Sequence, residues 1–198
     1  MVLVNGLPGS GKTTLARALA RRMSLPLISK DVIKEAYSDV FGIAPTEGHA
    51  RLEWSNAHGA GASETMWALA ADAPCGVILE SWWPRARTQY VEAGLRRAGI
   101  DRPLTVLCDV PFELARERFS RRAREGERHP IHFDTADPRE YDRAWADAEP
   151  LHVGPLLRVD TTTEVDLEPV VQWIEEQQAE ADRESAQADE ASRPAGGV

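Results

Sequence analysis

The sequence predicts an α/β fold built on a five-stranded parallel sheet. Short apolar runs of strand length recur along the chain, and a stretch with helical apolar spacing follows each of them. The first run is joined to its helix by a glycine-rich loop, residues 6–13 (GLPGSGKT). Strands that alternate with helices predict a parallel sheet, because each helix returns the chain to the same edge of the sheet. Such crossover connections are right-handed.

The first predicted strand (residues 2–4), the glycine-rich loop and a helix over residues 12–23 form one unit. The loop reads G-x-x-x-x-G-K-T, the pattern of a nucleotide phosphate-binding loop. Glycines let backbone N–H groups converge on phosphate oxygens, and the helix adds the positive end of its dipole. We expect Lys12 to reach the outer phosphates and the Thr13 hydroxyl to ligate Mg²⁺. The predicted nucleotide contacts of the loop are Gly6, Pro8, Gly9, Ser10, Gly11, Lys12, Thr13 and Thr14.

The first half of the chain continues with a strand over residues 25–29 and a helix that follows Asp31. Apolar doublets four residues apart (Val32-Ile33, Ala36-Tyr37, Val40-Phe41) give this helix a single apolar stripe. A loop over residues 42–48 precedes a helix over 49–72, whose expected anchors are Leu52, Met66, Leu69 and Ala70. The residues 58–61 (HGAG) predict a break or kink in that helix.

The second half predicts strands over residues 76–80, 104–108 and 156–159. Helices are expected from Pro84 to Ala98, from Pro111 to Arg124, over 138–148 and over 165–177, with a polar excursion at 125–136. Thr163 and Asp166 resemble a capping box for the last helix. From residue 179 onward large apolar residues are almost missing, so we expect a domain over 1–178 and a disordered acidic tail over 179–198.

Composition limits the partners and the compartment. The 198 residues include 23 Lys and Arg against 32 Asp and Glu, and the net charge of −9 argues against a nucleic-acid partner. Cys75 and Cys108 adjoin apolar runs and are expected to be reduced and buried. No apolar run approaches the ~20 residues that span a membrane, and a strand starting at Met1 or Val2 leaves no room for a signal peptide. We therefore expect a cytoplasmic protein; its oligomeric state cannot be inferred from the sequence.

Two carboxylates are expected at the carboxyl edge of the sheet, where ligands of open parallel sheets bind. Asp31 follows the second strand, and it can accept the proton of a substrate hydroxyl that attacks the γ-phosphate. The alternative for Asp31 is a helix cap. Glu80 ends the third strand, and it can orient Mg²⁺, the attacking hydroxyl or a water, or else pair with an arginine. Asp109 competes with Glu80 for this role but is expected to be structural.

Trp82 and Trp83 follow the third strand directly. Adjacent side chains at a strand end point in different directions, so one of them, Trp82, is a candidate to pack against a substrate ring. The alternative is that both pack beneath the helix over 49–72.

Arginines are dense after residue 115, and a segment over about 116–135 is a candidate lid that closes over ATP. Arg122 and Arg128 are the candidates to stabilise the transferring phosphoryl group, and Arg118 is a candidate nucleotide contact. Interspersed glutamates allow the plainer interpretation of a solvated, salt-bridged helix. His129 and His132 have no Cys or convincing carboxylate partners nearby in the sequence, so a metal site is not expected there. Asp160-Thr161-Thr162 either borders the adenine or forms a turn and helix cap.

Taken together, these stretches resemble the P-loop kinases of the zeta-toxin and chloramphenicol-phosphotransferase group, small ATP-binding kinases of bacteria. The stretches that carry the resemblance are residues 4–14 (VNGLPGSGKTT), 29–35 (SKDVIKE), 77–81 (VILES) and 121–130 (RRAREGERHP). The resemblance implies the three-layer P-loop NTPase sandwich, with strand order 2-3-1-4-5 and helices on both faces of the sheet. It also implies ATP and Mg²⁺, Asp31 as the base, an arginine-bearing lid, and Glu80 in place of the usual aspartate.

The predicted function is transfer of the γ-phosphoryl group of ATP to a hydroxyl of a small molecule. Antibiotics, sugars and nucleosides are the acceptor classes considered. One alternative is a kinase of 5′-hydroxyl polynucleotide ends, against which the net charge argues. Another alternative is a nucleotide-binding regulatory module that transfers no phosphoryl group.

Overall fold

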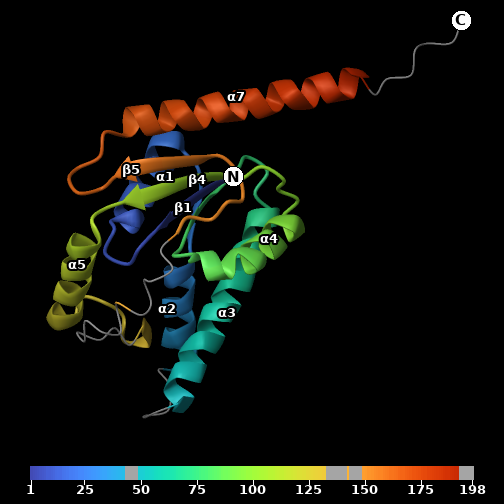
Figure 1. Ribbon diagram of the computed structural model, residues 1–198. Coiled ribbons are helices and arrows are strands. Elements are labelled where there is room, and N and C mark those ends of the chain that lie inside the picture. Colours follow the sequence, from blue (N-terminus) through green and yellow to red (C-terminus); the bar gives the residue numbers. More distant parts are fainter. Residues whose placement is uncertain (43–48, 133–141, 143–148, 192–198) are drawn as a thin grey trace, which may run out of the picture.

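The computed structural model describes residues 1–42, 49–132, 142 and 149–191. Its sheet has five parallel strands in the order β2-β3-β1-β4-β5 (Figure 1). The strands are β1 (Val2–Gly6), β2 (Leu27–Ser29), β3 (Ile78–Glu80), β4 (Leu104–Asp109) and β5 (Leu156–Asp160). Both the parallel sheet and the strand order are as the sequence and its resemblance predict.

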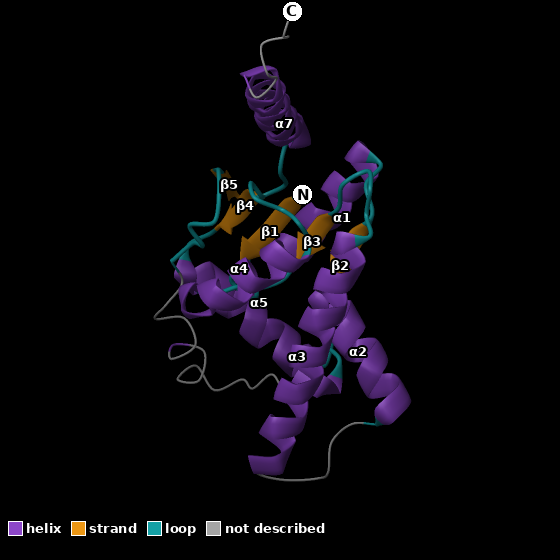
Figure 2. Cartoon of the chain, turned by 90° about the vertical axis from the view of Figure 1, so that its right-hand side faces the viewer, coloured by secondary structure: helices purple, strands orange, loops and turns teal. Residues whose placement is uncertain are grey.

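Helices cover both faces of the sheet, and the alternation of β1 shows why. Val2 and Val4 pack with α1 (Lys12–Met23) and α7 (Leu167–Ala191), whereas Leu3 packs into a separate cluster on the opposite face. That cluster includes residues of α3 (His49–Ala71) and α4 (Thr88–Arg97). Figures 1 and 2 show α7 on one side of the sheet and α2 (Lys30–Phe41), α3 and α4 on the other.

The carboxyl ends of the strands gather the residues of interest at one edge. Gly6, Ser29, Glu80, Asp109 and Asp160 are the last residues of β1, β2, β3, β4 and β5. The helix α5 (Phe112–Glu125) lies at the end of the sheet toward which the strand arrows point (Figure 1). Two short 3₁₀ helices, η1 (Arg85–Arg87) and η2 (Pro130–His132), follow Pro84 and the α5 segment.

The predicted break at residues 58–61 is wrong, because α3 runs without interruption from His49 to Ala71. Gly61 faces the Tyr37 ring, where an added Cβ would lie at an ordinary contact distance of 3.5 Å, so α3 and α2 pack together at this point. The Tyr37 hydroxyl also hydrogen-bonds to Thr65 across these helices. Here tertiary packing outweighs the low helix propensity of glycine.

The disorder predicted from residue 179 is contradicted as far as Ala191, because α7 continues to that residue. The Arg102 guanidinium binds Gln177, Glu180 and Glu184 on this helix, the two glutamates at 2.9 Å. The capping box is also wrong. The helix begins at Leu167, and the Asp166 side chain accepts a hydrogen bond from the Glu168 N–H at 3.1 Å.

Three further expectations differ from the structure or fall outside it. Leu69 is exposed rather than an anchor, whereas Met66 and Ala70 are buried as expected. Cys75 is a free, exposed thiol in the turn after α3, and Cys108 is free and buried. The predicted helix over 138–148 falls almost wholly outside the residues that the structure describes, and so does the side chain of the expected anchor Leu52, whose backbone belongs to α3. Among the described helices, none has the length and apolar character needed to span a membrane.

Candidate active site

The glycine-rich loop has the backbone shape that its sequence predicts. Gly9 (φ +88°) and Gly11 (φ +86°) adopt left-handed conformations, and Gly11 directly precedes α1. A Cβ on Gly9 would lie 2.1 Å from the Ala115 carbonyl oxygen, so α5 packs directly against the loop at this residue. Only glycine fits this close approach in this conformation.

Lys12 lies at the start of α1 and is buried. Its Nζ is 3.9 Å from Glu80 Oε1, and Asp31 also acts on it electrostatically. Burial is the main effect that lowers the pKa of Lys12; the two carboxylates oppose this effect, and Arg128 and Arg122 add to it. A lysine held this way, beside backbone N–H groups, is placed to bind phosphate oxygens.

Glu80 is 1% exposed and is held by hydroxyl groups of two neighbouring elements. Thr13 Oγ1 donates to Glu80 Oε1 at 3.2 Å, and Ser29 Oγ donates to Glu80 Oε2 at 2.5 Å. The register of β2 against β3 pairs Ser29 with Glu80 and explains the second bond. The Thr13 hydroxyl and the Glu80 carboxylate are hard oxygen donors that adjoin the phosphate loop, which suits Mg²⁺ bound partly through phosphates and waters.

Asp31 lies in the first turn of α2 and forms an ion pair with Arg128. Arg128 donates to Asp31 Oδ2 at 2.6 Å, with side chains that are 19% and 31% exposed. Burial raises the pKa of the Asp31 carboxyl, but Arg128 and then His132, Lys12 and Lys30 outweigh it and lower the pKa to about 2. Asp31 does not cap α2, because Ser29 occupies the N-cap position and makes no side-chain cap bond.

The arginines of α5 divide between the site and the surface. Arg118 donates to the carbonyls of Thr161 (3.0 Å) and Thr162 (2.7 Å), which hold the connection from β5 to α7 beside the phosphate loop. A Cβ on Gly11 would lie 3.8 Å from Thr161 Cβ. Arg122 acts electrostatically on Lys12, whereas Arg121 is exposed.

Asp109 and Asp160 have structural partners. Asp109 forms an ion pair with Arg158 at 3.3 Å, and its carbonyl accepts from Thr161 N at 2.9 Å. Asp160 accepts from the Thr162 N–H at 2.8 Å, which makes a turn. These contacts agree with the expectation of a structural role for Asp109 and with the turn interpretation of residues 160–162.

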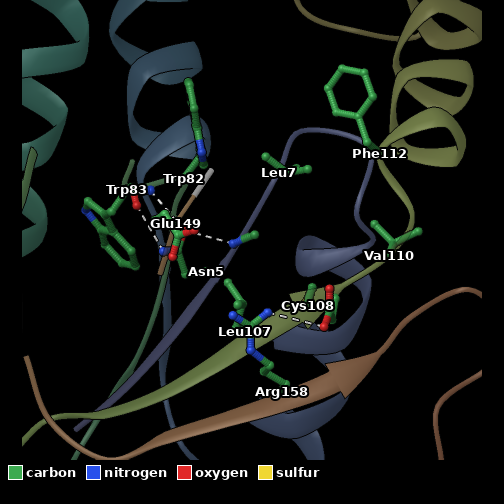
Figure 3. A pocket seen from close by; sticks show the side chains of 12 residues that line it. Asn5, Leu7, Trp82, Trp83, Leu107, Cys108, Val110, Phe112, Glu149 and Arg158 are labelled. Carbon is green, nitrogen blue, oxygen red and sulfur yellow. Dashed lines mark hydrogen bonds and ion pairs between the residues drawn. The ribbon is translucent and has the colours of Figure 1, made fainter. Parts of the chain in front are cut away.

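A cavity of about 200 Å³ opens beside the phosphate loop. Its lining includes Leu7, Trp82, Val110 and Phe112 (Figure 3), and Arg158, which forms an ion pair with Asp109, also lines it. Trp82 is half-buried and lines the cavity, whereas Trp83 is 6% exposed and packs near Trp67 in the core. The two tryptophans therefore point in different directions, as the sequence predicts.

Asn5 joins the loop to the tryptophan segment. Its Oδ1 accepts from the N–H groups of Gly6 (2.8 Å) and Trp83 (2.9 Å), and its Nδ2 donates to the Trp83 carbonyl at 3.0 Å. The Asn5 side chain thus connects β1 to the backbone of Trp83, which lies beyond the end of β3 and no longer pairs with β1 as a strand.

His129 and His132 contact carboxylates of α2. His132 Nε2 lies 2.8 Å from Glu35 Oε1, and His129 Nε2 lies 3.1 Å from Asp39 Oδ1. In the part of the chain that the structure describes, no group of three or more His, Cys, Asp or Glu residues is arranged to hold a metal ion.

The sequence analysis missed Ser29, Lys30, Glu35 and Asn5 as site residues. The four-residue spacing of Asp31, Glu35 and Asp39, which places them on one face of a helix, was an available signal. Lys30 carried no comparable pattern. In the structure, burial lowers its pKa, and its charged neighbours include Asp31 and Arg87.

Comparison with protein families gives this geometry a context. A family model described as an AAA domain (AAA_33) matches residues 1–144. The chain belongs to this AAA domain family. A crystal structure from Chloroflexus aurantiacus, described provisionally as a kinase, is 34% identical, with a TM-score of 0.76 over 88% of this chain and 96% of that one.

Other kinases resemble this AAA domain more remotely. The shikimate kinase of Acinetobacter baumannii, solved with shikimate, has a TM-score of 0.57 and 17% identity over 91% of this chain and 93% of its own, a likeness of fold alone. The cytidylate kinase of Pyrobaculum arsenaticum is 42% identical over 53 residues, which are 27% of this chain and 29% of that kinase. The chain thus matches less than a third of the length of this curated relative.

Proposed function

We propose that this AAA domain is an ATP-dependent phosphotransferase that moves the γ-phosphoryl group to a hydroxyl of a small molecule. One observation carries the proposal: a carboxylate outside the phosphate loop, Asp31, lies in the same charged cluster as Lys12 and Glu80. A module that only binds nucleotide has no need of this additional carboxylate.

The phosphate loop and α1 supply the nucleotide site in this proposal. The predicted contacts are Gly6, Pro8, Gly9, Ser10, Gly11, Lys12, Thr13, Thr14 and Arg118. Thr13 and Glu80 would hold Mg²⁺, which neutralises charge on the β- and γ-phosphates when bound. The bond between Thr13 and Glu80 supports this pairing, because it brings both donors to one point beside Lys12.

Asp31 is the proposed base. It accepts the proton of the acceptor hydroxyl while the hydroxyl oxygen forms a bond to the γ-phosphorus. The bond from that phosphorus to the bridging oxygen then breaks, and ADP leaves with the electron pair. Lys12, Arg122 and Arg128 supply the cations for the charge on the transferring group.

The acceptor site in this proposal includes the cavity beside Leu7 and Trp82, together with Asp31 and Glu80. Its volume of about 200 Å³ suits one small ring better than a polynucleotide. The net charge of −9 also disfavours a polyanionic acceptor. Membership of the zeta-toxin and chloramphenicol-phosphotransferase group, and a cytoplasmic location, belong to the same proposal and rest on the sequence motifs and composition.

The test uses γ-labelled ATP, Mg²⁺ and a panel of aminoglycosides, phenicols, nucleosides, sugars and 5′-hydroxyl oligonucleotides. We expect label in one small-molecule class, and we expect Lys12→Ala and Asp31→Asn to lose it. Asp101→Asn serves as the control: it changes an exposed carboxylate that is not one of the proposed site residues, and it should retain transfer.

Other outcomes would replace the proposal. Transfer to oligonucleotides that weakens with salt would identify the polynucleotide kinase alternative. Tight ATP binding that survives Asp31→Asn, without transfer to any acceptor, would favour the regulatory module. Full transfer by Asp31→Asn would remove Asp31 from the base role.

A further inference from the structure

Residues 128–132, here called the 128–132 segment, lie along one face of α2. The segment pairs with three carboxylates that are four residues apart on that helix: Arg128 with Asp31, His132 with Glu35 and His129 with Asp39. The spacing of four residues places the carboxylates in one row, one helical turn from each to the next.

Ile131 anchors this segment between two helices. Its side chain is fully buried, and its carbonyl accepts from the Ser55 hydroxyl of α3 at 3.0 Å. Lys34 of α2 donates to the same hydroxyl at 2.7 Å. The segment is therefore tied to α2 and α3 by a buried side chain and a hydrogen-bonded chain, in addition to its ion pairs.

The two histidine contacts differ in burial. The His132 ring is 6% exposed, whereas Asp39 on the outer pair is 71% exposed. The Ile131 N–H donates to His129 Nδ1, so neutral His129 donates from Nε2 to Asp39. Exposed pairs contribute little, so of the two histidine contacts the pair of His132 with Glu35, here called the inner pair, holds the segment more firmly.

We infer that Glu35 and His132 are positioning residues of phosphoryl transfer: their bond holds the 128–132 segment on α2 and thereby sets the Arg128 guanidinium on Asp31. This role rests on the proposed function, and it gives Glu35 and His132 a part in phosphoryl transfer although they lie outside the phosphate loop. Arg128 also acts electrostatically on Lys12, so the position that Glu35 and His132 give it brings it near both the base and the phosphate-binding lysine.

The decisive comparison uses two substitutions at one position. His132→Phe keeps a ring but removes the N–H donor, whereas His132→Gln keeps an N–H donor near the place of Nε2. Asp39→Ala breaks the outer, exposed pair and is the matched control. Glu35→Ala removes the other partner of the inner bond and covers the case in which His132→Phe folds poorly.

The first readout is the ¹³C shift of the Asp31 carboxyl between pH 4 and 7, in free protein. Burial first, and Arg128 second, lower the pKa of His132 to about 3, so the ring carries no charge in this range. Removing the ring can therefore change Asp31 here only through the placement of its neighbours. Among the described residues, the charged or titratable groups that face His132 include Glu35, Asp31, Lys34, Arg128 and His129.

We expect Asp31 to stay ionised throughout this range in the wild type, in His132→Gln and in Asp39→Ala. In His132→Phe and Glu35→Ala it should titrate, as it should in Arg128→Gln, and the double variant with Arg128→Gln should show no further change. The second readout is turnover: about a tenfold lower kcat in His132→Phe with an unchanged KM for ATP.

An Asp31 carboxyl that stays ionised in both His132→Phe and Glu35→Ala would overturn the inference. So would a loss of turnover in His132→Phe that adds to the loss in Arg128→Gln. If no phosphoryl transfer is found in any variant, the proposed function fails. The NMR comparison then still decides whether Glu35 and His132 place Arg128.

Discussion

Glu80 shows how one buried side chain supports several groups of the site. It accepts from Thr13 and Ser29 and lies 3.9 Å from the Lys12 amine, although it is only 1% exposed. Removing its charge leaves Lys12 buried with less compensation, and a buried charge that loses its partner is costly.

We expect Glu80→Gln to lower kcat about 100-fold and to raise the Mg²⁺ concentration needed for half-maximal rate. Glu80→Asp keeps the charge and should stay within about tenfold of the wild type. Turnover measured against Mg²⁺ concentration checks this. Equal rates for Glu80→Gln and Glu80→Asp would show that the charge is not needed.

The ion pair between Asp31 and Arg128 predicts an unusual pH dependence. Because the pKa of Asp31 is lowered from 3.8 to about 2, the carboxylate stays ionised well below neutral pH. Its contribution to stability is therefore present above pH 3.8 and is lost as the pH falls through about 2. In Arg128→Gln the largest opposing charge is gone, so burial raises the pKa.

We expect the relative rate of Arg128→Gln to fall on acidification at a higher pH than that of the wild type, measured as log kcat against pH. Arg121→Gln, at an exposed site on the same helix α5, should keep the wild-type profile. Superimposed profiles for Arg128→Gln and the wild type would separate Arg128 from the ionisation of Asp31.

The residues of the site that the sequence predicts are those with a local signature. The loop has its glycine spacing, and Asp31 and Glu80 have their places beside strand ends. Glu35 and His132 are 97 residues apart, and their contact depends on how the 128–132 segment packs on α2, which no local pattern specifies. The same applies to Asn5 and Trp83, which are 78 residues apart.

Among the elements, α5 packs tightly against the phosphate loop. Gly9 combines a φ of +88° with a Cβ position 2.1 Å from the Ala115 carbonyl. We expect Gly9→Ala to abolish nucleotide binding and to lower the free energy of unfolding by more than about 2 kcal/mol. Gly99→Ala, with φ +65° and open space around it, should cost about 1 kcal/mol and leave binding intact. Urea unfolding and nucleotide titration measure both effects, and unchanged binding in Gly9→Ala would contradict the close packing.

The side chain of Arg102 ties the C-terminal half of α7 to the main body. Arg102 binds Gln177, Glu180 and Glu184, and the helix beyond has few large apolar residues to pack. We expect Arg102→Gln to speed amide hydrogen exchange at 177–191 about tenfold while the sheet is unaffected. Arg96→Gln, at an exposed site of α4, is the control. Unchanged exchange in Arg102→Gln would mean that helix propensity alone maintains this part of α7.

The elements follow the sequence where apolar periodicity is strong. All five strands and the helices α1, α2, α4 and α5 lie close to their predicted positions. Two of the errors share one cause, because composition was taken as decisive where packing or a distant partner decides. Residues 58–61 lie in an unbroken α3 that packs on α2, and Arg102 holds a segment that composition alone marks as disordered.

For the whole molecule, the proposed nucleotide site connects elements from both halves of the chain. Glu80, Ala115 and Thr161 come from three separate regions, and each of them lies against the phosphate loop. A ligand that binds the folded state here stabilises the whole fold by about 2.7 kcal/mol at 100 times its Kd, or roughly 5–10 °C in Tm.

We therefore expect Mg²⁺ and ATP together to raise the Tm by this amount, as measured by calorimetry. Lys12→Ala should show little or no increase, while Arg96→Gln should match the wild type. An equal increase in Lys12→Ala would indicate that the nucleotide binds elsewhere.

The Asn5 amide has a consequence for how this enzyme can diversify. Its three hydrogen bonds fix the backbone of Gly6, in the phosphate loop, and of Trp83, which directly follows Trp82. A substitution of the Trp82 side chain alters the wall of the cavity and leaves these backbone hydrogen bonds in place. Acceptor preference can thus be altered, by evolution or by an engineer, independently of the machinery that handles ATP.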